Sequence, residues 1–433
     1  MIWNETAECR SREEMRRLQG ERLRETVERV YHNTPFYRRK MQEMGLMPDD
    51  IETIDDIVKL PFTTKQDLRD NYPYGLFAVP MSEIIRLHAS SGTTGNPTVV
   101  GYTRHDLSVW SEMIARCLSA YGATRDDIFH VAYGYGLFTG GLGLHYGVET
   151  LGGTVIPASS GNTLKQIQLL RDFGATAIAC TPSYALFLGE AIAAAGVAMK
   201  DIKLRIGIFG AEPWTENMRR EIEAKLGIKA YNIYGLSEIM GPGVSHECEC
   251  QCGSHIIEDH FFAEIIDPDT LQQQPHGTTG ELAFTTLTKE GLPLLRYRTK
   301  DLCSLDESPC ACGRTTARMS RIIGRSDDML IIRGVNVFPS QIESVILGVE
   351  ECEPHYLLVV NRVNNLDTLE VQIEVREDFF SDELSKMLDL RKKIGHRIQS
   401  VLGIAADVKL VEPRSIPRSE GKAKRVIDNR KFE

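Results

Sequence analysis

A short loop of small, hydroxyl-bearing residues has the composition of a phosphate-binding segment. Residues 90–97 read Ser-Ser-Gly-Thr-Thr-Gly-Asn-Pro, with four hydroxyls, two glycines and no charged side chain, and the flanking residues 83–89 and 99–103 are expected to form strands. In such a loop the backbone N–H groups approach phosphate oxygens closely, and the hydroxyls add hydrogen-bond donors. The loop lacks the Gly-Lys-Ser/Thr ending of a P-loop, and alone it is also typical of a flexible hairpin. It indicates a nucleoside triphosphate only together with other motifs of the chain.

Five later segments bring polar or charged residues to positions that suit a ligand site. Two of them end predicted strands, and ligands of open α/β sheets bind at the carboxyl ends of the strands. Each segment alone is also typical of a surface turn, a charge run or a solvated tail. Their occurrence together and in this order favours one shared site. The segments are Phe209–Pro213, Tyr231–Glu238, Tyr297–Asp301, Gly324–Asp328 and Pro417–Arg425.

The uneven distribution of cysteines indicates a metal site. Six of the ten cysteines lie between residues 248 and 312, mostly in two close-spaced groups. In a reducing compartment such groups bind metal rather than form disulfides, and tetrahedral ligation by Cys and His suits zinc. Free surface thiols are the alternative. The predicted zinc ligands are Cys310 and Cys312 as one pair, Cys252 as the third, and His246 as the fourth, with Cys248 and Cys250 competing for that last position.

The composition argues against several classes of protein. The chain has 433 residues, too many for one ordinary core, so two or three domains are expected. The formal net charge of −10 gives no sign of a nucleic-acid surface, and no apolar run reaches the length of a membrane span. The N-terminus has no basic segment followed by an apolar one, so no signal peptide is expected. A cytoplasmic protein without nucleic-acid or membrane partners is predicted.

The pattern of apolar segments predicts an α/β architecture that can position these motifs. Residues 10–44 have the spacing of a surface helix pair. From residue 105 to 260 short apolar strands alternate with helices, which predicts a large domain of mostly parallel sheets flanked by helices. Residues 260–330 change to short β segments with turn signals, which favours a small β-barrel-like subdomain or an antiparallel sheet. Beyond residue 326 a compact α+β domain follows, so the expected domains are residues 1–326 and 327–433.

In their order along the chain, these motifs resemble those of the adenylate-forming superfamily of acyl-CoA synthetases, luciferases and peptide-synthetase adenylation domains. The resemblance covers essentially the whole chain. Within the superfamily, Thr63–Arg69, Tyr234–Val244 and Arg333–Glu343 are close to the phenylacetate–CoA ligase subfamily.

This resemblance implies a two-step reaction. A carboxylate attacks the α-phosphorus of ATP, which gives an acyl-adenylate and pyrophosphate, and the CoA thiol then displaces AMP. The implied activity is ATP-dependent ligation of an aryl acetate, with phenylacetate the first choice, to CoA, as in phenylacetate catabolism. The alternative is an adenylating enzyme that loads another aryl acid onto a carrier-protein thiol.

The resemblance also assigns roles to residues of these motifs. Lys422, Glu238 and Arg325 are the implied catalytic residues, with Lys424 as a lesser alternative to Lys422. Glu238 would bind Mg²⁺, since a hard cation prefers carboxylate oxygen. Asp327 is the implied hinge, about which a mobile C-terminal domain would rotate between the two steps. The implied ATP- and AMP-binding residues are Ser90, Ser91, Gly92, Thr93, Thr94, Gly95, Gly210, Ala211, Glu212, Pro213, Asn232, Ile233, Tyr234, Gly235, Ser237, Asp301 and Arg325.

The pocket for the acid is predicted from residues 129–141, which combine aromatic residues with glycines. Glycines leave room, and aromatic rings supply flat apolar walls for an aryl group. A Gly-rich helix start with packing aromatic rings is the equally weighted alternative. Tyr135, Phe138 and Gly141 are the candidate pocket residues. No cationic partner for a second carboxylate stands out, so a monocarboxylic aryl acid is favoured, and the resemblance suggests a homodimer.

Overall fold

The computed structural model describes residues 1–90, 96–327, 330–332, 335–363, 366–379, 384–418 and 425–430, and these fall into two units. The first unit comprises Met1–Cys180, Ala198–Ala211 and Ile228–Arg321, and the second comprises Thr181–Val197, Glu212–Gly227 and Ile322–Glu433. The second unit thus begins before the expected boundary at residue 327 and also takes in two earlier segments. The predicted domain bounds and the predicted mobility of the C-terminal domain stay predictions. Among the described residues, no helix is both long enough and apolar enough to cross a membrane.

The first unit contains seven α-helices and fourteen strands among its described residues. Its helices are α1 (Glu5–Glu8), α2 (Arg12–Asn33), α3 (Pro35–Glu43), α4 (Lys65–Asp70), α5 (Arg104–Ala120), α6 (Thr139–Leu151) and α7 (Thr163–Asp172). Its strands are β1 (Arg86–Ala89), β2 (Val99–Tyr102), β3 (Ile128–Val131), β4 (Thr154–Ile156), β5 (Ala177–Cys180), β6 (Ile206–Phe209), β7 (Lys229–Leu236), β8 (Gly241–His246), β9 (Ser254–Ile256), β10 (Phe261–Ile266), β11 (Gly280–Thr286), β12 (Tyr297–Cys303), β13 (Leu305–Asp306) and β14 (Arg318–Met319).

The N-terminal helices begin where their sequences provide caps. Ser11 caps α2, and its side chain and that of Glu14 bond each other's backbone N–H groups in a capping box. Thr34 ends α2, and Pro35 starts α3 at the position where a missing N–H costs nothing. This confirms the predicted helix pair. Thr64 caps α4 in the same way as Ser11 caps α2.

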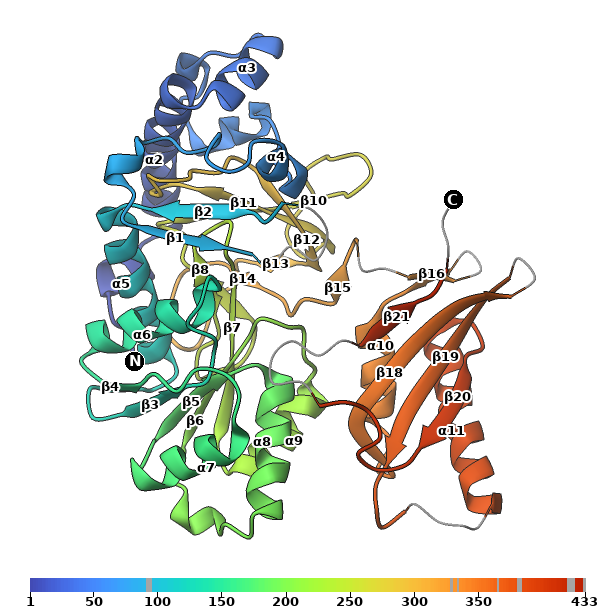
Figure 1. Ribbon diagram of the computed structural model, residues 1–433. Helices are drawn as coiled ribbons and strands as arrows, with labels where there is room; N and C mark the ends of the chain where they lie inside the picture. The colour runs from blue at the N-terminus through green and yellow to red at the C-terminus, as the bar shows by residue number, and fades with distance from the viewer. Residues whose placement is uncertain are drawn as a thin grey trace. The chain divides into compact units, whose positions relative to one another are not determined.

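A nine-stranded sheet forms the centre of the first unit (Figure 1), in the order β13-β14-β9-β8-β7-β6-β5-β3-β4. Strands β3 to β7 pair in parallel, whereas β7–β8, β8–β9, β9–β14 and β13–β14 pair antiparallel. The prediction of mostly parallel sheets is therefore correct only for one half of this nine-stranded sheet. The physical reason is chain length: a parallel connection needs a crossover of about a dozen residues or more, and the turn from β7 to β8 is too short for one.

Strands β10, β11 and β12 form a separate antiparallel sheet in that order. Among the described residues, β11 pairs with β10 on one side and with β12 on the other. The predicted switch to short antiparallel strands is therefore correct, and the barrel-like form of this subdomain stays a prediction. Turn signals mark where strands end, but they do not show whether the sheet edges meet.

Buried aromatic rings fix the start of β8 against α5. Trp110 stacks on Tyr102 with ring centroids 5.2 Å apart, and its Nε1 donates to the carbonyl of Pro242 at 2.9 Å. A Cβ atom on Gly241 would lie 2.3 Å from the Trp110 ring, and the Gly241 φ of +125° is also unfavourable for other residues. Glycine at this position lets the turn between β7 and β8 lie directly on the core.

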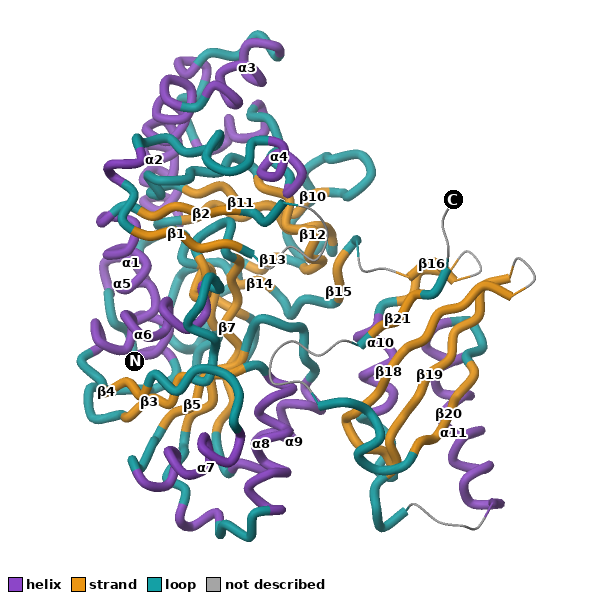
Figure 2. Tube along the Cα trace, in the orientation of Figure 1, coloured by secondary structure: helices purple, strands orange, loops and turns teal. Residues whose placement is uncertain are grey.

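The second unit contains the C-terminal α+β fold that the sequence predicts. Its sheet has the order β20-β19-β18-β21, and Figure 2 shows these strands with α11 beside them. Side chains of α10 and α11, including Ile342, Ile346, Ile394 and Ile398, share one core with this sheet. Its elements are α8 (Pro182–Ala194), α9 (Glu216–Leu226), α10 (Pro339–Ile346), α11 (Leu384–Leu402), β15 (Gly324–Arg325), β16 (Leu330–Ile332), β17 (Val335–Val337), β18 (Cys352–Val363), β19 (Leu366–Val375), β20 (Asp407–Val411) and β21 (Val426–Asp428).

Candidate active site and cysteine cluster

The base of the hydroxyl-rich loop is a hairpin of β1 and β2, as the sequence predicts. The two strands pair antiparallel, and Ser90 and Thr98 close the hairpin beyond them. The Ser90 N–H donates to the Thr98 carbonyl at 3.0 Å, and the two hydroxyls lie 2.5 Å apart. Ser91, Gly92, Thr93, Thr94 and Gly95 lie outside the described residues, so their phosphate-binding role stays a prediction. The hairpin nevertheless fixes the relative positions of Ser90 and Thr98, which flank that loop in the sequence.

The carboxylate of Glu238 lies beside this hairpin base. The Thr98 hydroxyl donates to Glu238 Oε1 at 3.3 Å, and Lys65 Nζ lies 3.6 Å from the same oxygen. The Glu238 side chain is only 8% exposed. Two segments that are far apart in the chain thus place a carboxylate and an ammonium group next to the predicted phosphate loop. Carboxylate and hydroxyl oxygens are the donors that Mg²⁺ prefers, so this part of the site fits the predicted ion.

Lys289 holds the backbone that carries Glu238. Its buried ammonium group donates to the carbonyl oxygens of Glu238 and Ile239 at 3.0 and 2.8 Å, and it lies 4.9 Å from the centroid of the Tyr102 ring. The sequence interpretation missed Lys289, Lys65 and Thr98. Lys65 follows a helix cap and Thr98 follows a proline, but neither spacing nor residue type relates them to a glutamate in another part of the chain.

A pH dependence of stability follows from the burial of Lys289. Burial lowers the pKa of Lys289 from 10.5 to about 8, although the charges of Asp106 and Glu238 oppose this shift. Between these values the unfolded chain binds more protons than the folded one, so stability rises with pH, by about 1.4 kcal/mol per unit for a fully shifted group. Urea unfolding at about pH 7.5 and about pH 10 is expected to show this gain in the wild type and not in Lys289→Met. The exposed Lys200→Met is the control, and equal pH dependence in wild type and Lys289→Met would contradict the assignment.

The predicted ribose-binding residue Asp301 is held by a neighbouring strand. Tyr234 on β7 donates its hydroxyl to Asp301 Oδ2 on β12 at 2.6 Å. Burial of this hydroxyl and the negative charge of Asp301 raise the pKa of Tyr234 well above its usual value, so the phenol stays a donor. The Tyr234 ring also stacks on Phe284, with centroids 6.3 Å apart. The structure thus brings together two residues that the sequence places in different motifs.

Gly210 follows β6 and packs against β7. Phe209 pairs with Asn232, and a Cβ atom on Gly210 would lie 2.2 Å from the carbonyl oxygen of Ile233. Only glycine permits this approach, so the predicted adenine-binding residues of the first unit lie together at one end of two parallel strands. Glu212 and Pro213 belong to the second unit. There the Glu212 carboxylate accepts the backbone N–H of Ser183, near the N-terminus of α8, at 2.7 Å.

The predicted acid-binding segment, residues 129–141, contacts the turn that follows β7 and carries Glu238. Thr139 at the start of α6 bonds Ser237 at 3.0 Å between hydroxyls. Tyr135 reaches His145 Nδ1 at 3.3 Å, and burial raises the pKa of the Tyr135 phenol. Phe138 is 38% exposed. The roles of these residues in a pocket stay predictions.

Close packing explains why residue 141 is a glycine, and the sequence interpretation did not give this explanation. A Cβ atom there would lie 2.6 Å from the carbonyl oxygen of Gly134, so the position is filled by backbone. Residue type alone cannot separate a glycine that opens a pocket from one that permits close packing, because both need the same missing side chain.

The predicted hinge and its neighbouring arginine interact within the second unit. Arg325 forms a two-pronged ion pair with Asp327, with both N–O distances at 2.9 Å. The side chains are 32% and 51% exposed, so solvent screens much of this attraction. The hinge role of Asp327 and the nucleotide contact of Arg325 stay predictions. Lys422 and its alternative Lys424 lie outside the described residues.

Cysteines and one histidine gather at the edge of the nine-stranded sheet. The side chains of Cys248, His255, Cys310 and Cys312 offer four ligand atoms that all lie within 4.8 Å of one another. This group contains Cys310 and Cys312, the predicted pair, and Cys248, which the sequence left open as an alternative fourth ligand. It also contains His255, which was not predicted, whereas the predicted Cys252 and His246 lie outside it. The physical reason is the strand pairing of β8 with β9, which puts His255 opposite His246.

Cys252 and His246, the predicted ligands that lie outside this group, have other partners. His246 Nδ1 lies 2.8 Å from the carbonyl of Glu247, and Cys252 Sγ lies 2.8 Å from Arg318 Nη1. The sequence interpretation did not consider His255, because it lies outside the Cys-rich motifs. Its position two residues after Cys252-Gly253 is the only local signal that could have suggested it.

Comparison with known proteins identifies the family of this chain. The AMP-binding enzyme family matches residues 47–287, and the AMP-binding enzyme C-terminal domain matches residues 334–430. The chain is 52% identical to the phenylacetate–CoA ligase of Thermus thermophilus, with 100% of both chains covered, and 54% identical to that of Escherichia coli, with 98% of this chain and 97% of the other covered.

A solved structure has the same fold over nearly the whole chain. It is a 2-hydroxyisobutyryl-CoA ligase in the postadenylation state, with a TM-score of 0.93 and 29% identity, covering 98% of this chain and 92% of that one. The chain therefore belongs to the AMP-binding enzyme family and, within it, to the phenylacetate–CoA ligases. This confirms the resemblance drawn from the sequence motifs.

Proposed function

We propose that this protein is an AMP-forming acid–thiol ligase that joins phenylacetate to coenzyme A with ATP as the energy source. The observation that carries this proposal is the position of the buried Glu238 carboxylate beside Ser90 and Thr98, in a chain more than half identical to phenylacetate–CoA ligases over its length. ATP and CoA are available together in the cytoplasm, which is the proposed location of the reaction.

The first step forms a bond between a carboxylate oxygen of the acid and the α-phosphorus of ATP, and pyrophosphate leaves. Negative charge collects on phosphoryl oxygens in the transition state, so fixed donors and cations around them lower the barrier. The residues from Ser90 to Gly95 would hold the departing phosphates. Mg²⁺ bound by Glu238 would neutralise part of their charge. Lys65, 3.6 Å from Glu238, is a further cation at this end of the site.

The nucleoside would be held near the carboxyl ends of β6 and β7. Asp301 would accept the two ribose hydroxyls, and Tyr234 keeps that carboxylate in place through its 2.6 Å hydrogen bond. The backbone around Gly210 and Asn232 would frame the adenine. In the second step the CoA thiol loses its proton, its sulfur attacks the acyl carbon, and AMP leaves with the electron pair of the broken C–O bond.

Two half-reactions test the proposed function. Purified protein with phenylacetate, ATP and Mg²⁺ is expected to release pyrophosphate, and addition of CoA is expected to release AMP and form phenylacetyl-CoA in equal amounts. A screen of hydroxyphenylacetate, indoleacetate, benzoate and aliphatic acids in the same assay ranks the acids. Absence of pyrophosphate release with phenylacetate would contradict the proposal. An adenylate that CoA does not consume would instead favour transfer to a carrier protein.

The acid pocket can be tested at Phe138. Phe138→Ala is expected to raise KM for phenylacetate about three- to tenfold with KM for ATP unchanged, because an aromatic contact contributes about 0.5–1.5 kcal/mol. The matched control is Phe173→Ala, which removes an exposed ring at the end of α7. Steady-state kinetics with each substrate varied in turn gives both constants. An equal rise in both KM values would place Phe138 outside the acid pocket.

The proposed homodimer rests on the resemblance alone. Sedimentation equilibrium or light scattering of the purified chain gives its mass directly, and a mass of one chain over the working concentration range would contradict it.

A further inference from the structure

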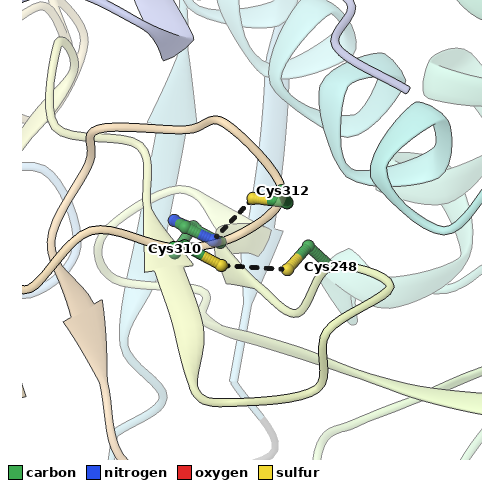
Figure 3. Close-up of side chains that lie close together, drawn as sticks. Cys248, Cys310 and Cys312 are labelled. Carbon is green, nitrogen blue, oxygen red and sulfur yellow. Dashed lines mark hydrogen bonds between the residues drawn. The ribbon is translucent and has the colours of Figure 1, made fainter.

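The four residues Cys248, His255, Cys310 and Cys312 come from two turns that lie far apart in the sequence. Cys248 follows β8 and His255 lies in β9, whereas Cys310 and Cys312 lie between β13 and β14. Figure 3 shows the three cysteine side chains converging on one point from these two turns. Nothing in the proposed ligase reaction uses these residues.

Two separations between ligand atoms of this group are close to those of a tetrahedral metal site. With Zn–S bonds of about 2.3 Å and Zn–N bonds of about 2.0–2.1 Å, tetrahedral angles place two sulfur ligands about 3.8 Å apart and a sulfur and a nitrogen about 3.6 Å apart. The Sγ atoms of Cys248 and Cys310 are 3.7 Å apart, and Cys312 Sγ is 3.4 Å from His255 Nε2. A disulfide would need sulfur atoms at about 2.05 Å, so the pair is not a disulfide.

The surroundings of the cluster support a buried, sulfur-rich site. Cys248 and His255 are fully buried and Cys310 is 8% exposed. His255 directs Nε2 toward the sulfur atoms, and its Nδ1 lies 3.0 Å from Thr316 Oγ1 and 3.3 Å from the Thr316 carbonyl. A second hydrogen bond of this kind orients metal-binding imidazoles. Three sulfur donors and one imidazole select zinc over Mg²⁺ or Ca²⁺, which prefer oxygen.

We propose that Cys248, His255, Cys310 and Cys312 bind one structural zinc ion that joins the β8–β9 turn to the β13–β14 turn. Four protein ligands leave no open position, so the ion takes no part in the ligase chemistry. The proposed zinc site lies near the carboxyl end of β8, whereas Glu238 lies in the turn before the start of β8. From Gly241 to Cys248 is seven residues, or about 20 Å of extended chain.

The cluster also borders the N-terminal segment. Arg314, two residues after Cys312, donates through Nε to Glu8 Oε2 at 2.6 Å, and both side chains are buried. The Thr315 N–H donates to the Glu8 carbonyl at 3.1 Å. Loosening of the turn between β13 and β14 is therefore expected to release residues 1–10 as well.

Metal analysis of the full-length protein tests the proposal without any activity measurement. Protein purified without chelators from zinc-replete medium is expected to contain about one zinc ion per chain. Replacement of that ion by Co²⁺ is expected to give the strong visible absorption of a tetrahedral cobalt–thiolate site. Wild-type protein with less than about 0.1 equivalent of zinc, and no uptake of added Zn²⁺ or Co²⁺, would overturn the proposal.

Substitutions identify the ligand set. Cys310→Ser and His255→Asn are expected to lose most of the bound zinc, whereas Cys252→Ser and the exposed Cys250→Ser keep it. Cys252→Ser is the sharper control, because its Sγ lies 3.7 Å from Cys310 Sγ without belonging to the four-atom group. Loss of zinc in Cys252→Ser with retention in His255→Asn would overturn the assignment in favour of the other ligand set.

A stability measurement covers the case in which a ligand variant does not fold. Stripping zinc from the wild type with a strong chelator is expected to lower Tm by more than about 5 °C and to increase hydrogen exchange in residues 247–256 and 308–317. Added Zn²⁺ is expected to restore both. Unchanged Tm and exchange after complete removal of the metal would overturn the structural role. Pyrophosphate release, measured on the same samples, reports separately on the proposed ligase function.

Discussion

Glu238→Gln is expected to lower the rate of pyrophosphate release with phenylacetate and ATP by about 10²- to 10³-fold. The carboxylate is almost fully buried, and it lies 3.3 Å from the Thr98 hydroxyl at the base of the predicted phosphate loop. Glutamine keeps the shape of the side chain and its capacity to accept the Thr98 hydroxyl. It removes the negative charge that would bind the metal ion, so the loss should fall on the chemical step.

The measurement is a continuous pyrophosphate assay over a range of Mg²⁺ concentrations. In Glu238→Gln the dependence on Mg²⁺ is expected to shift to higher concentrations, which a purely structural defect would not produce. Glu25→Gln, at an exposed position of α2, is the matched control for the loss of one charge. Wild-type rates with an unchanged Mg²⁺ dependence in Glu238→Gln would refute the assignment of this residue.

Lys422→Ala is expected to separate the two half-reactions. Pyrophosphate release should fall by about 10²- to 10³-fold, because an ammonium group at the α-phosphate and the attacking carboxylate stabilises charge that develops only in the first step. Thioester formation from prepared phenylacetyl-adenylate and CoA should stay within about threefold of the wild-type rate, since this step does not need that charge.

Lys422 itself lies outside the described residues, but Arg418 and Arg425 on either side of it in the sequence are described. In the second unit, Arg418 forms a two-pronged pair with the buried carboxylate of Glu374, with both N–O distances at 2.8 Å. Arg425 lies 4.5 Å from the centroid of the Tyr356 ring and donates to Ser183 Oγ at 3.3 Å. Arg418 and Arg425, which are described residues before and after Lys422 in the sequence, thus each have partners in the second unit.

Lys424→Ala is the matched control, because it removes the same charge two residues away. It is expected to retain near-wild-type rates in both half-reactions. The reverse result, with loss of adenylation in Lys424→Ala and retention in Lys422→Ala, would transfer the catalytic role to Lys424. Equal loss of both half-reactions in Lys422→Ala would indicate a defect in folding or in CoA binding instead.

Local sequence rules predict the elements well where local forces decide. Caps at Ser11 and Thr64, a proline at position 35 and apolar runs such as Ala177–Cys180 mark helices and strands that the structure contains. The direction of β8, β9 and β14 and the edges of the β10–β12 sheet depend on which strands meet in space. Such pairing is set by non-local packing, which periodicity does not report.

The same division holds for the site. Tyr234, Glu238 and Asp301 are candidates from the sequence because each sits in a motif whose residues are adjacent. Lys65, Thr98 and Lys289 approach Glu238 from three other segments, and no motif connects them to it. The cysteine cluster shows both cases: Cys310 and Cys312 are recognisable by spacing, whereas His255 enters through the register of β8 with β9.

The anchoring of the segment before α6 has a consequence for how acid preference can change. Tyr133 donates its hydroxyl to the carbonyl of Cys180 at 2.6 Å, and Thr139 bonds Ser237 at 3.0 Å. Tyr135 and Phe138 lie between these two attachment points. With the acid pocket predicted here, substitutions between the anchors are expected to change the preferred acid while Thr139 and Ser237 keep their positions. The segment is thus the natural place to redesign this enzyme for other acids, with Tyr133 and Thr139 left unchanged.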